Sequence, residues 1–486
     1  MMSAQSILVT LKVFETELHE PTSARMHCRR SVVAGTIDKI KSSCLKWNRF
    51  HWRFWSISRP SKFRAAKIDL VHWGGHMFHK TRLMAQTAIA LAIGATAGHA
   101  QEAEVIHFWT SGGESAAISV LADAFEERGG EWTDNAIAGG SAARSAAINR
   151  IIGGDPSTAA LFNTSQQYHE IIAEGLLNDI DDVATRNDWD NILPAPIVDA
   201  IKVDGRYYAA PVNIHMPLWI WYSSGALEQA GIESPPKTME EFFAALDALQ
   251  AADITPLALG GQRWQENLLF SAMMTNVGGR DLWTGIYADK DEEAITSPEF
   301  REVIETFVRL KPYVDSASPG RNWNDATAML IGDTAGFQIM GDWAKGEFTQ
   351  ADQQIGVDYN CLPGLREDAP YVLGGDVFVF PRTEDPAQIE AQNLLAETIT
   401  APDVQVAFNN LKGSIPIRFD VDVSAMDACA ALGMEIMGDP SRLVPDASQM
   451  MNEYVYGSVQ DVVTELWNTD MSVDEAVERF GNALQN

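Results

Sequence analysis

Aromatic, acidic, amide and basic side chains lie directly after predicted strands or in glycine-containing loops. Apolar runs over residues 105–109, 159–162 and 335–340 are typical of buried strands, and each precedes such side chains. In open α/β sheets, ligands bind outside the carboxyl ends of the strands. Indole rings stack on flat apolar faces, and charged and amide groups form directed hydrogen bonds, so this set suits noncovalent binding of a polar small molecule. The candidates are Trp109, Glu114, Asn163, Trp264, Gln265, Asp342, Trp343 and Lys345.

Further candidates lie where the chain is expected to pass between two lobes, or in a late loop. The apolar segment over residues 207–222 is interrupted by prolines, which suit strand ends and crossovers rather than central ladders. His215 lies in this first passage. Asp376 follows two glycines in a second passage, and Lys412 and Arg418 flank the late loop Lys-Gly-Ser-Ile-Pro-Ile-Arg.

Several candidates also have an ordinary structural interpretation. Trp109 suits a buried core ring, and Trp264 suits packing against a helix. Glu114 suits a capping box with Ser111 at the start of a helix. Lys345 suits a solvated salt bridge, and His215 suits a hydrogen-bonded interior imidazole. Sequence alone leaves both interpretations open for each residue.

Catalytic and metal-binding motifs are not evident in the sequence. We find no P-loop, no GxGxxG after a strand, no HExxH and no GxSxG elbow, which weakens an enzymatic interpretation. The acidic residues Asp179, Asp181, Asp182, Asp188 and Asp190 lack the spacing, central glycine and terminal glutamate of an EF-hand, so a solvated acidic turn is favoured over a calcium loop. We expect neither a metal nor a cofactor.

The composition predicts a packed globular protein that does not bind nucleic acid. The chain has 486 residues, of which 46% are hydrophobic and 21% charged, enough for two large lobes. Residues 101–486 carry 21 Lys and Arg against 61 Asp and Glu. Such an acidic surface repels phosphate backbones and anionic lipid.

The N-terminal region predicts export. Residues 77–100 contain a basic start, an apolar run of about 13 residues and a small-x-small cleavage signal, as a secretory signal peptide does. This run is too short to span a bilayer, so no stable membrane insertion is expected. Residues 1–76 are interpreted as a misassigned start, with a disordered extension as the alternative. In the exported part, Cys361 and Cys429 are expected to form one structural disulfide.

Hydrophobic periodicity indicates an α/β protein. Helical spacing recurs over residues 142–152, 168–175, 239–250 and 300–310, with short apolar strands between them. A strand over 105–109, a glycine-containing loop and a helix form the opening unit of a parallel layer. The two predicted passages imply lobes built from discontinuous segments.

Four segments resemble the sugar-binding proteins of bacterial ABC importers. They are VIHFWTSGGE, DGRYYAAPVNIHMPLWIWYS, AMLIGDTAGFQIMGDWAKGEF and KGSIPIR, and the resemblance covers residues 103–486. The match looks closest to the glucose/mannose-type binding proteins, because of the Trp-Thr-Ser-Gly-Gly-Glu opening, the late loop and the cysteine pair. This chain has Phe108-Trp109 where that subgroup often has two adjacent tryptophans, a difference that bears on sugar preference.

The resemblance implies a two-lobed periplasmic-binding-protein fold with a hinged ligand cleft. Each lobe would hold a mostly parallel sheet flanked by helices. The first lobe would span residues 103–213 and 374–424, and the second residues 214–373 and 425–486. Asp342 and Trp343 would lie in the cleft, since the matching segment of the family supplies cleft residues.

We therefore expect a monomeric periplasmic protein that binds a monosaccharide such as glucose and delivers it to the permease subunits of an ABC importer. One alternative is a secreted carbohydrate-active enzyme, in which the same tryptophans form subsites and the acids are catalytic. A sensor-coupled or structural envelope protein is a third possibility, and it requires a partner domain. Sugar turnover distinguishes the enzyme from the binding protein.

Overall fold

The computed structural model describes residues 101–424 and 426–485. The expected signal peptide at residues 77–100 and the expected extension at residues 1–76 lie outside these described residues.

The first sheet is formed by five strands in the order β2-β1-β3-β12-β6. β1 pairs in parallel with β2 and β3, whereas β12 runs antiparallel to β3 and β6. β3 and β12 are apolar and buried along almost their whole length, as expected for central strands covered on both faces. The strands are β1 (Gln101–His107), β2 (Gly130–Ala136), β3 (Ala159–Asn163), β6 (Ala209–Pro211) and β12 (Asp376–Val379).

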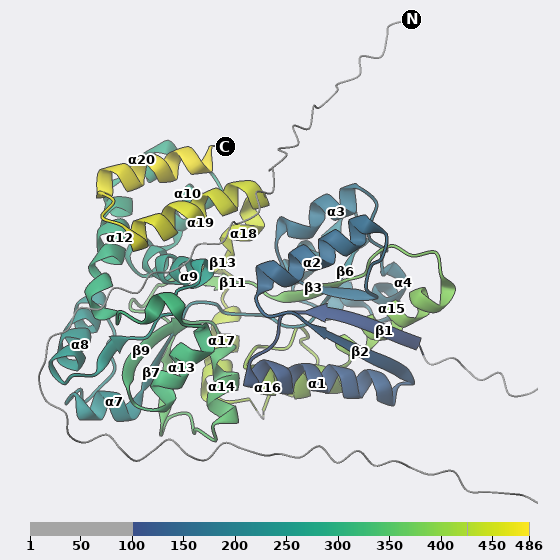
Figure 1. Ribbon diagram of the computed structural model, residues 1–486, viewed down its shortest axis with the longest axis horizontal. Helices are drawn as coiled ribbons and strands as arrows, with labels where there is room; N and C mark the ends of the chain where they lie inside the picture. Colours follow the sequence, from purple (N-terminus) through teal and green to yellow (C-terminus); the bar gives the residue numbers. More distant parts are fainter. Residues whose placement is uncertain (1–100, 425, 486) are drawn as a thin grey trace, which may run out of the picture. The chain divides into compact units, whose positions relative to one another are not determined.

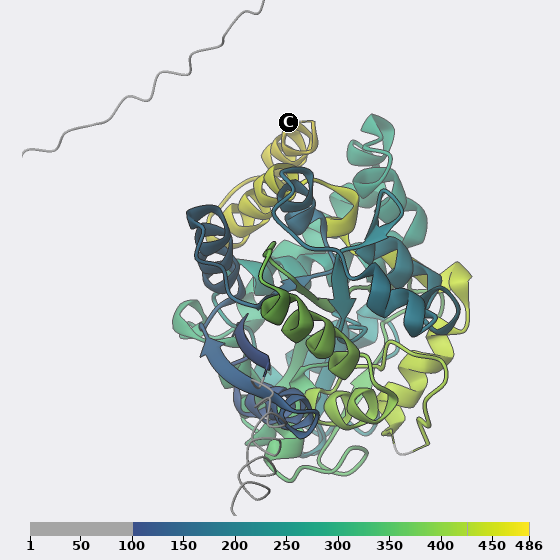
Figure 2. The same cartoon turned by 90° about the vertical axis from the view of Figure 1, so that its right-hand side faces the viewer.

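Helices cover both faces of this sheet. Figure 1 shows α1 and α16 below the sheet and α2 and α3 above it, and in Figure 2 α15 lies in front of the strands. The helix after β1 begins with the expected capping box, in which Ser111 and Glu114 each bind the other's backbone N–H. The helices are α1 (Gly112–Glu127), α2 (Gly140–Gly153), α3 (His169–Ala173), α15 (Pro386–Ile399) and α16 (Pro402–Lys412).

The second sheet has four strands in the order β10-β7-β9-β8. β7 is antiparallel to both β10 and β9, and only β8 and β9 are parallel. The expected α/β class with mostly parallel sheets is confirmed, because in each of these two sheets one strand, β12 or β7, runs opposite to all the others. The strands are β7 (Trp219–Ser223), β8 (Thr255–Leu257), β9 (Ala335–Met340) and β10 (Tyr359–Leu362).

The helices around the second sheet come from the middle and the end of the chain. Two C-terminal helices, α19 and α20, pack on α9 and α12. The principal helices are α7 (Ser224–Gln229), α8 (Met239–Ala251), α9 (Arg263–Met273), the π-helix η2 (Met274–Gly278), α10 (Gly279–Tyr287), α12 (Pro298–Arg309), α13 (Trp323–Ile331), α14 (Ala344–Gln350), α17 (Ala428–Met437), α19 (Glu453–Asn468) and α20 (Val473–Leu484).

Short elements complete the fold. They are the helices α4 (Asp181–Arg186), α5 (Trp189–Ile192), α6 (Ala195–Ile201), α11 (Glu292–Ile295) and α18 (Ala447–Met450), and the strands β4 (Lys202–Val203), β5 (Arg206–Tyr207), β11 (Tyr371–Leu373) and β13 (Leu443–Pro445).

Three chain segments that connect the sheets are hydrogen-bonded to one another. His215 pairs with Gly374 and Ile214 with Ile415, each through two backbone hydrogen bonds. Gly375 permits the close approach of these segments, because a Cβ atom there would lie 2.4 Å from the carbonyl oxygen of Asn213. The expected passages are therefore joined side by side in the structure.

Helices α1 and α14 meet at two glycines. A Cβ atom on Gly113 would lie 2.6 Å from the carbonyl carbon of Gly346, so the two backbones are in direct contact. The N–H of Gly113 donates to Oε1 of Glu347 at 2.8 Å. This contact joins a helix of the first sheet to the helix that follows β9.

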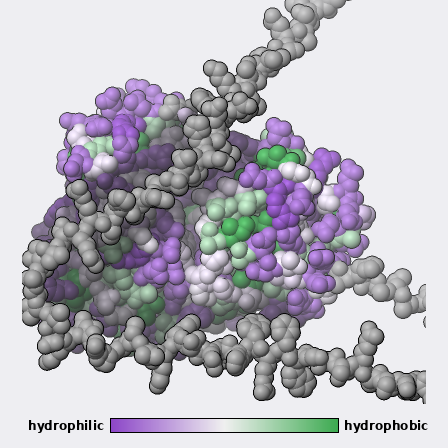
Figure 3. All heavy atoms as spheres, viewed as in Figure 1, coloured by the Kyte–Doolittle hydropathy of each residue, from purple (hydrophilic) through white to green (hydrophobic). Residues whose placement is uncertain are grey.

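The predicted disulfide between Cys361 and Cys429 is confirmed, and it joins β10 to α17. Two large apolar clusters form the interior, one centred on the first sheet and one on the helices of the second. Among the described residues, none of the helices has both the length and the apolar character needed to cross a bilayer. The face seen in Figure 3 is mostly hydrophilic, with an apolar patch near β3 and the start of α2.

Candidate ligand-binding site

A buried histidine lies between two aspartates that come from different sheets. Nδ1 of His215 is 2.5 Å from Oδ1 of Asp342, in the loop after β9, and Nε2 is 2.8 Å from Oδ2 of Asp376, at the start of β12. The side chains of all three residues are at most 7% exposed. Asp342 also accepts the N–H of Met216 at 2.9 Å. Carboxylates only accept hydrogen bonds, so both ring nitrogens donate.

Polar contacts continue from Asp376 into the first sheet. Oδ1 of Asp376 accepts from Nδ2 of Asn163 at 2.8 Å, and Oδ1 of Asn163 accepts from Arg144 at 2.9 Å. Asn213 donates its amide to Oδ2 of Asp376 at 3.1 Å. We call the chain of five side chains Arg144, Asn163, Asp376, His215 and Asp342 the central cluster. Sequence reasoning missed Arg144 and Asn213, although Arg144 follows a strand and a Gly-Gly turn.

Opposite charges in and beside the central cluster keep His215 and Asp376 ionised. Burial alone lowers the pKa of His215, but the carboxylates of Asp342 and Asp376 outweigh it and raise this pKa to about 9. For Asp376, burial acts to raise the pKa, and the neighbouring His215 and Lys412 together hold it below its usual value. The imidazole is therefore a cation at neutral pH, compensated by a carboxylate on each side.

A second group of candidates lies beside this cluster. Nζ of Lys412 is 3.6 Å from Oε1 of Glu114, 5.6 Å from the centre of the Trp109 ring and 5.8 Å from that of Trp343. The Trp343 ring meets the His215 imidazole edge to face, with 4.9 Å between centroids. The ammonium group therefore lies near two indoles, a favourable arrangement for a cation.

The tryptophans differ in accessibility. Trp343 and Trp264 are partly exposed, and their centroids are 6.2 Å apart. Trp109 is only 1% exposed, and its ring packs against Phe378 and Phe408 in the core. Partly exposed rings offer a face to a ligand without rearrangement, so Trp343 and Trp264 are better placed for stacking than Trp109. The predicted ligand contact of Trp109 stays a prediction.

Three predicted site residues make contacts outside the central cluster. Trp264 and Gln265 were expected in a loop, but both lie in the first turn of α9. Oε1 of Gln265 instead accepts the N–H of Gly260, which fixes the preceding loop. Lys345 forms a buried ion pair with Asp427. Arg418 donates to Asp420 and to the carbonyl of Thr400. These local contacts account for the positions of the Gln265, Lys345 and Arg418 side chains, and their role as ligand contacts stays a prediction.

The acidic turn also has local partners. Asp179 and Asp181 pair with Arg206, while Asp190 pairs with Lys202. No group of three or more potential metal ligands occurs within residues 101–424 and 426–485. The favoured interpretation as a solvated turn therefore matches the ion pairs of the described residues.

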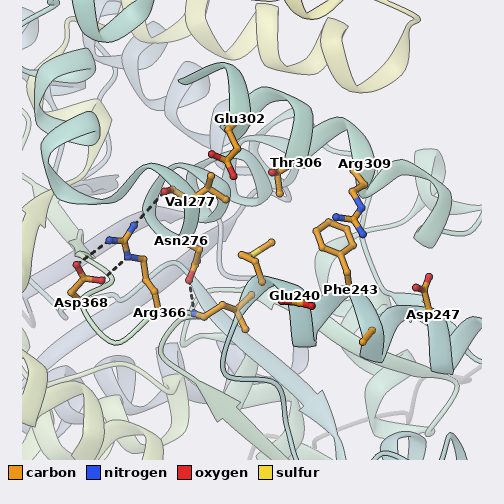
Figure 4. A pocket seen from close by; sticks show the side chains of 13 residues that line it. Glu240, Phe243, Asp247, Asn276, Val277, Glu302, Thr306, Arg309, Arg366 and Asp368 are labelled. Atoms are coloured by element: carbon orange, nitrogen blue, oxygen red, sulfur yellow. Dashed lines mark hydrogen bonds and ion pairs between the residues drawn. The ribbon is translucent and has the colours of Figure 1, made fainter. Parts of the chain in front are cut away.

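A cavity of about 710 Å³ lies on another part of the molecule. Figure 4 shows Arg309 against Phe243 on one side and the Arg366–Asp368 pair on the other, with Glu240 and Glu302 between them. We call this space the outer cavity. Its charged side chains are largely exposed, and none belongs to the central cluster.

The family of the chain follows from its sequence. The sequence profile of a family described as "Bacterial extracellular solute-binding protein" matches residues 120–429, more than half of the chain. A curated protein of Rhizobium meliloti, named "Probable sugar-binding periplasmic protein", is 36% identical over 83% of this chain and 99% of its own length. The chain belongs to the bacterial extracellular solute-binding proteins.

Solved structures show the same fold as this solute-binding protein. One, titled "Chitin oligosaccharide binding protein", has a TM-score of 0.69 at 18% identity and covers 80% of this chain and 99% of its own. Another, titled "Maltose bound T. maritima MalE3", has a TM-score of 0.66 at 19% identity, over 79% and 99%. The resemblance to ABC-importer sugar-binding proteins and the two-lobed α/β fold are thus confirmed.

Proposed function

We propose that this chain is the periplasmic receptor of a carbohydrate ABC importer, which binds a neutral monosaccharide such as glucose between its two lobes and releases it unaltered to the permease. The lobes are those with the boundaries given above, and the chain acts as a monomer exported through residues 77–100. The names of the relatives and the family support this role.

The observation that carries the proposal is the convergence of polar groups and indoles from both sheets. Asn163 and Asp376 come from the first sheet, Asp342 and Trp343 follow β9 of the second, and His215 joins them. Convergent polar groups beside aromatic rings are what a sugar requires. A stacked ring and several hydrogen bonds, less the ordering costs, reach roughly −8 kcal/mol, the scale of micromolar binding.

The charge balance of the site favours a neutral sugar over a sugar acid or a sugar phosphate. His215 pairs with Asp342 and Asp376, and Lys412 lies 3.6 Å from Glu114. Arg144 is linked to Asp376 through Asn163, so each of these charges has a compensating neighbour. An anionic ligand would have to separate pairs that already satisfy one another, which costs free energy in a buried site.

A thermal-shift screen of the exported protein tests the proposal, because a ligand of the native state raises the unfolding midpoint. The panel contains neutral mono- and oligosaccharides, with glucuronate and glucose 6-phosphate as charged controls. We expect one or a few neutral monosaccharides to raise the midpoint and to change tryptophan fluorescence saturably, with the sugar recovered unaltered. Product formation would support the carbohydrate-active enzyme instead, and a preference for the charged sugars would contradict the neutral ligand.

A further inference from the structure

The side chain of His215 is the link between the two carboxylates nearest the junction of the sheets. Its backbone is fixed by two hydrogen bonds to Gly374, 2.9 and 3.1 Å long. Asp376 is further held by Asn163 and Asn213, and Asp342 by the N–H of Met216. The imidazole thus spans two carboxylates that are each anchored in a different sheet region.

Both links require the doubly protonated ring. A neutral imidazole has one N–H, so one carboxylate would then face a lone pair and repel it. The groups that face the ring come from several elements. Asp342 and Trp343 come from the loop after β9, and Asp376 comes from β12. Lys412 of α16 acts on the ring indirectly, because its charge lowers the pKa of Asp376.

We propose that His215 is a positioning residue: its imidazolium holds Asp342 and Asp376 in the orientation that accepts sugar hydroxyls, and loss of its proton frees one lobe from the other. This inference rests on the proposed function, and it assigns His215 a role through its two aspartates rather than by contact with the sugar.

The electrostatics agree with this role. The two carboxylates raise the pKa of His215 to about 9, so the double link is complete at neutral pH and is lost in alkaline solution. Losing one of these two charged hydrogen bonds is therefore expected to weaken sugar binding about tenfold or more.

The first experiment measures sugar affinity between pH 7 and 10 for the wild type, for His215→Gln and for His169→Gln. The sugar is the best ligand of the thermal-shift panel. His169 lies outside the central cluster and provides the matched control. We expect the wild type and His169→Gln to lose affinity about tenfold around pH 9, and His215→Gln to bind weakly at every pH. Wild-type affinity and an unchanged pH profile in His215→Gln would overturn the inference.

The second experiment needs neither a sugar nor a variant. Nitrogen-15 NMR of histidine-labelled wild-type protein reports whether each ring nitrogen carries a proton. We expect His215 to be doubly protonated at pH 7.5 and to titrate well above pH 7. Titration at or below pH 7 would overturn the inference even if a sugar binds. Conversely, an alkaline titration without binding of any panel sugar would refute the proposed function and leave the imidazolium link between the two aspartates established.

Discussion

The central cluster and the outer cavity are both rich in charged side chains, but they differ in how those charges are held. In the central cluster, His215, Asp342 and Asp376 are almost fully buried and each charge has an opposite partner within hydrogen-bonding distance. In the outer cavity, Glu240 and Glu302 are exposed to solvent, where water screens their charges.

This difference shows that volume alone is a poor guide to a binding site. Polar groups are buried only when they are hydrogen-bonded, so a buried convergence of charges is maintained by strong and specific contacts. Exposed ion pairs such as Arg366–Asp368 contribute little free energy. The convergence at His215 therefore supports a functional site better than the size of the outer cavity does.

Removing the disulfide is expected to have one of the two largest effects on stability. Cys361 and Cys429 are separated by 68 residues, and opening a loop of that size costs about 4 kcal/mol of unfolding free energy. The bridge lies next to the Lys345–Asp427 pair and not in the central cluster. The double variant Cys361→Ser/Cys429→Ser should therefore unfold at lower urea concentration yet retain its sugar affinity. A parallel loss of affinity would show that the bridge also supports the cluster.

Substitution of Asp342 compares the two regions directly. Asp342→Ala removes one partner of a buried ion pair and is expected to lower the unfolding free energy by about 4 kcal/mol. Glu302→Ala, at the outer cavity, should change it by less than about 0.5 kcal/mol. Urea denaturation of both variants measures the difference. Equal effects would contradict the distinction between the two regions.

Alkaline pH should weaken the central cluster. The pKa of His215 is raised from 6.5 to about 9 on folding, so its contribution to stability is complete below pH 6.5 and is lost as the pH rises through 9. The shift corresponds to about 3 kcal/mol. Melting temperatures from pH 6 to 10 should fall for the wild type and for Glu302→Ala, and fall much less for His215→Gln. A flat wild-type profile would count against a charged imidazole.

Sugar affinity should depend on the partly exposed indoles. Trp343→Ala is expected to weaken binding by about 2 kcal/mol, the usual contribution of one stacked ring. Phe419→Ala removes an aromatic ring that is 69% exposed outside the cluster and should leave the dissociation constant unchanged. Isothermal titration calorimetry with the panel sugar measures both. Unchanged affinity in Trp343→Ala would move the sugar away from the central cluster.

Much of the local structure was predictable from sequence because its signals are local. Apolar runs identified β3 and β9, and the Ser111 and Glu114 pair identified the start of α1. Which strand runs opposite to its neighbours, β12 in the first sheet and β7 in the second, was not predictable, since pairing depends on residues far apart in the chain.

The contacts within the candidate site were also not predictable, because they join residues far apart in the chain. The types of His215, Asp342 and Asp376 indicated a polar site, but their mutual contacts span 127 and 161 residues, and no local pattern encodes them. Gln265 was misplaced because a Gly-Gly sequence is typical of a loop, whereas here the helix begins two residues later. The burial of Trp109 also depends on long-range packing, against Phe378 and Phe408.

The contact between Gly113 and Gly346 sets the spacing of α1 and α14 independently of the side chains that are proposed to face the ligand. Main-chain atoms, not side chains, set the spacing at that corner, and even a methyl group on Gly113 would force it apart. Substitution of the surrounding aromatic and amide side chains therefore leaves the spacing of α1 and α14 unchanged, because the two backbones set that spacing.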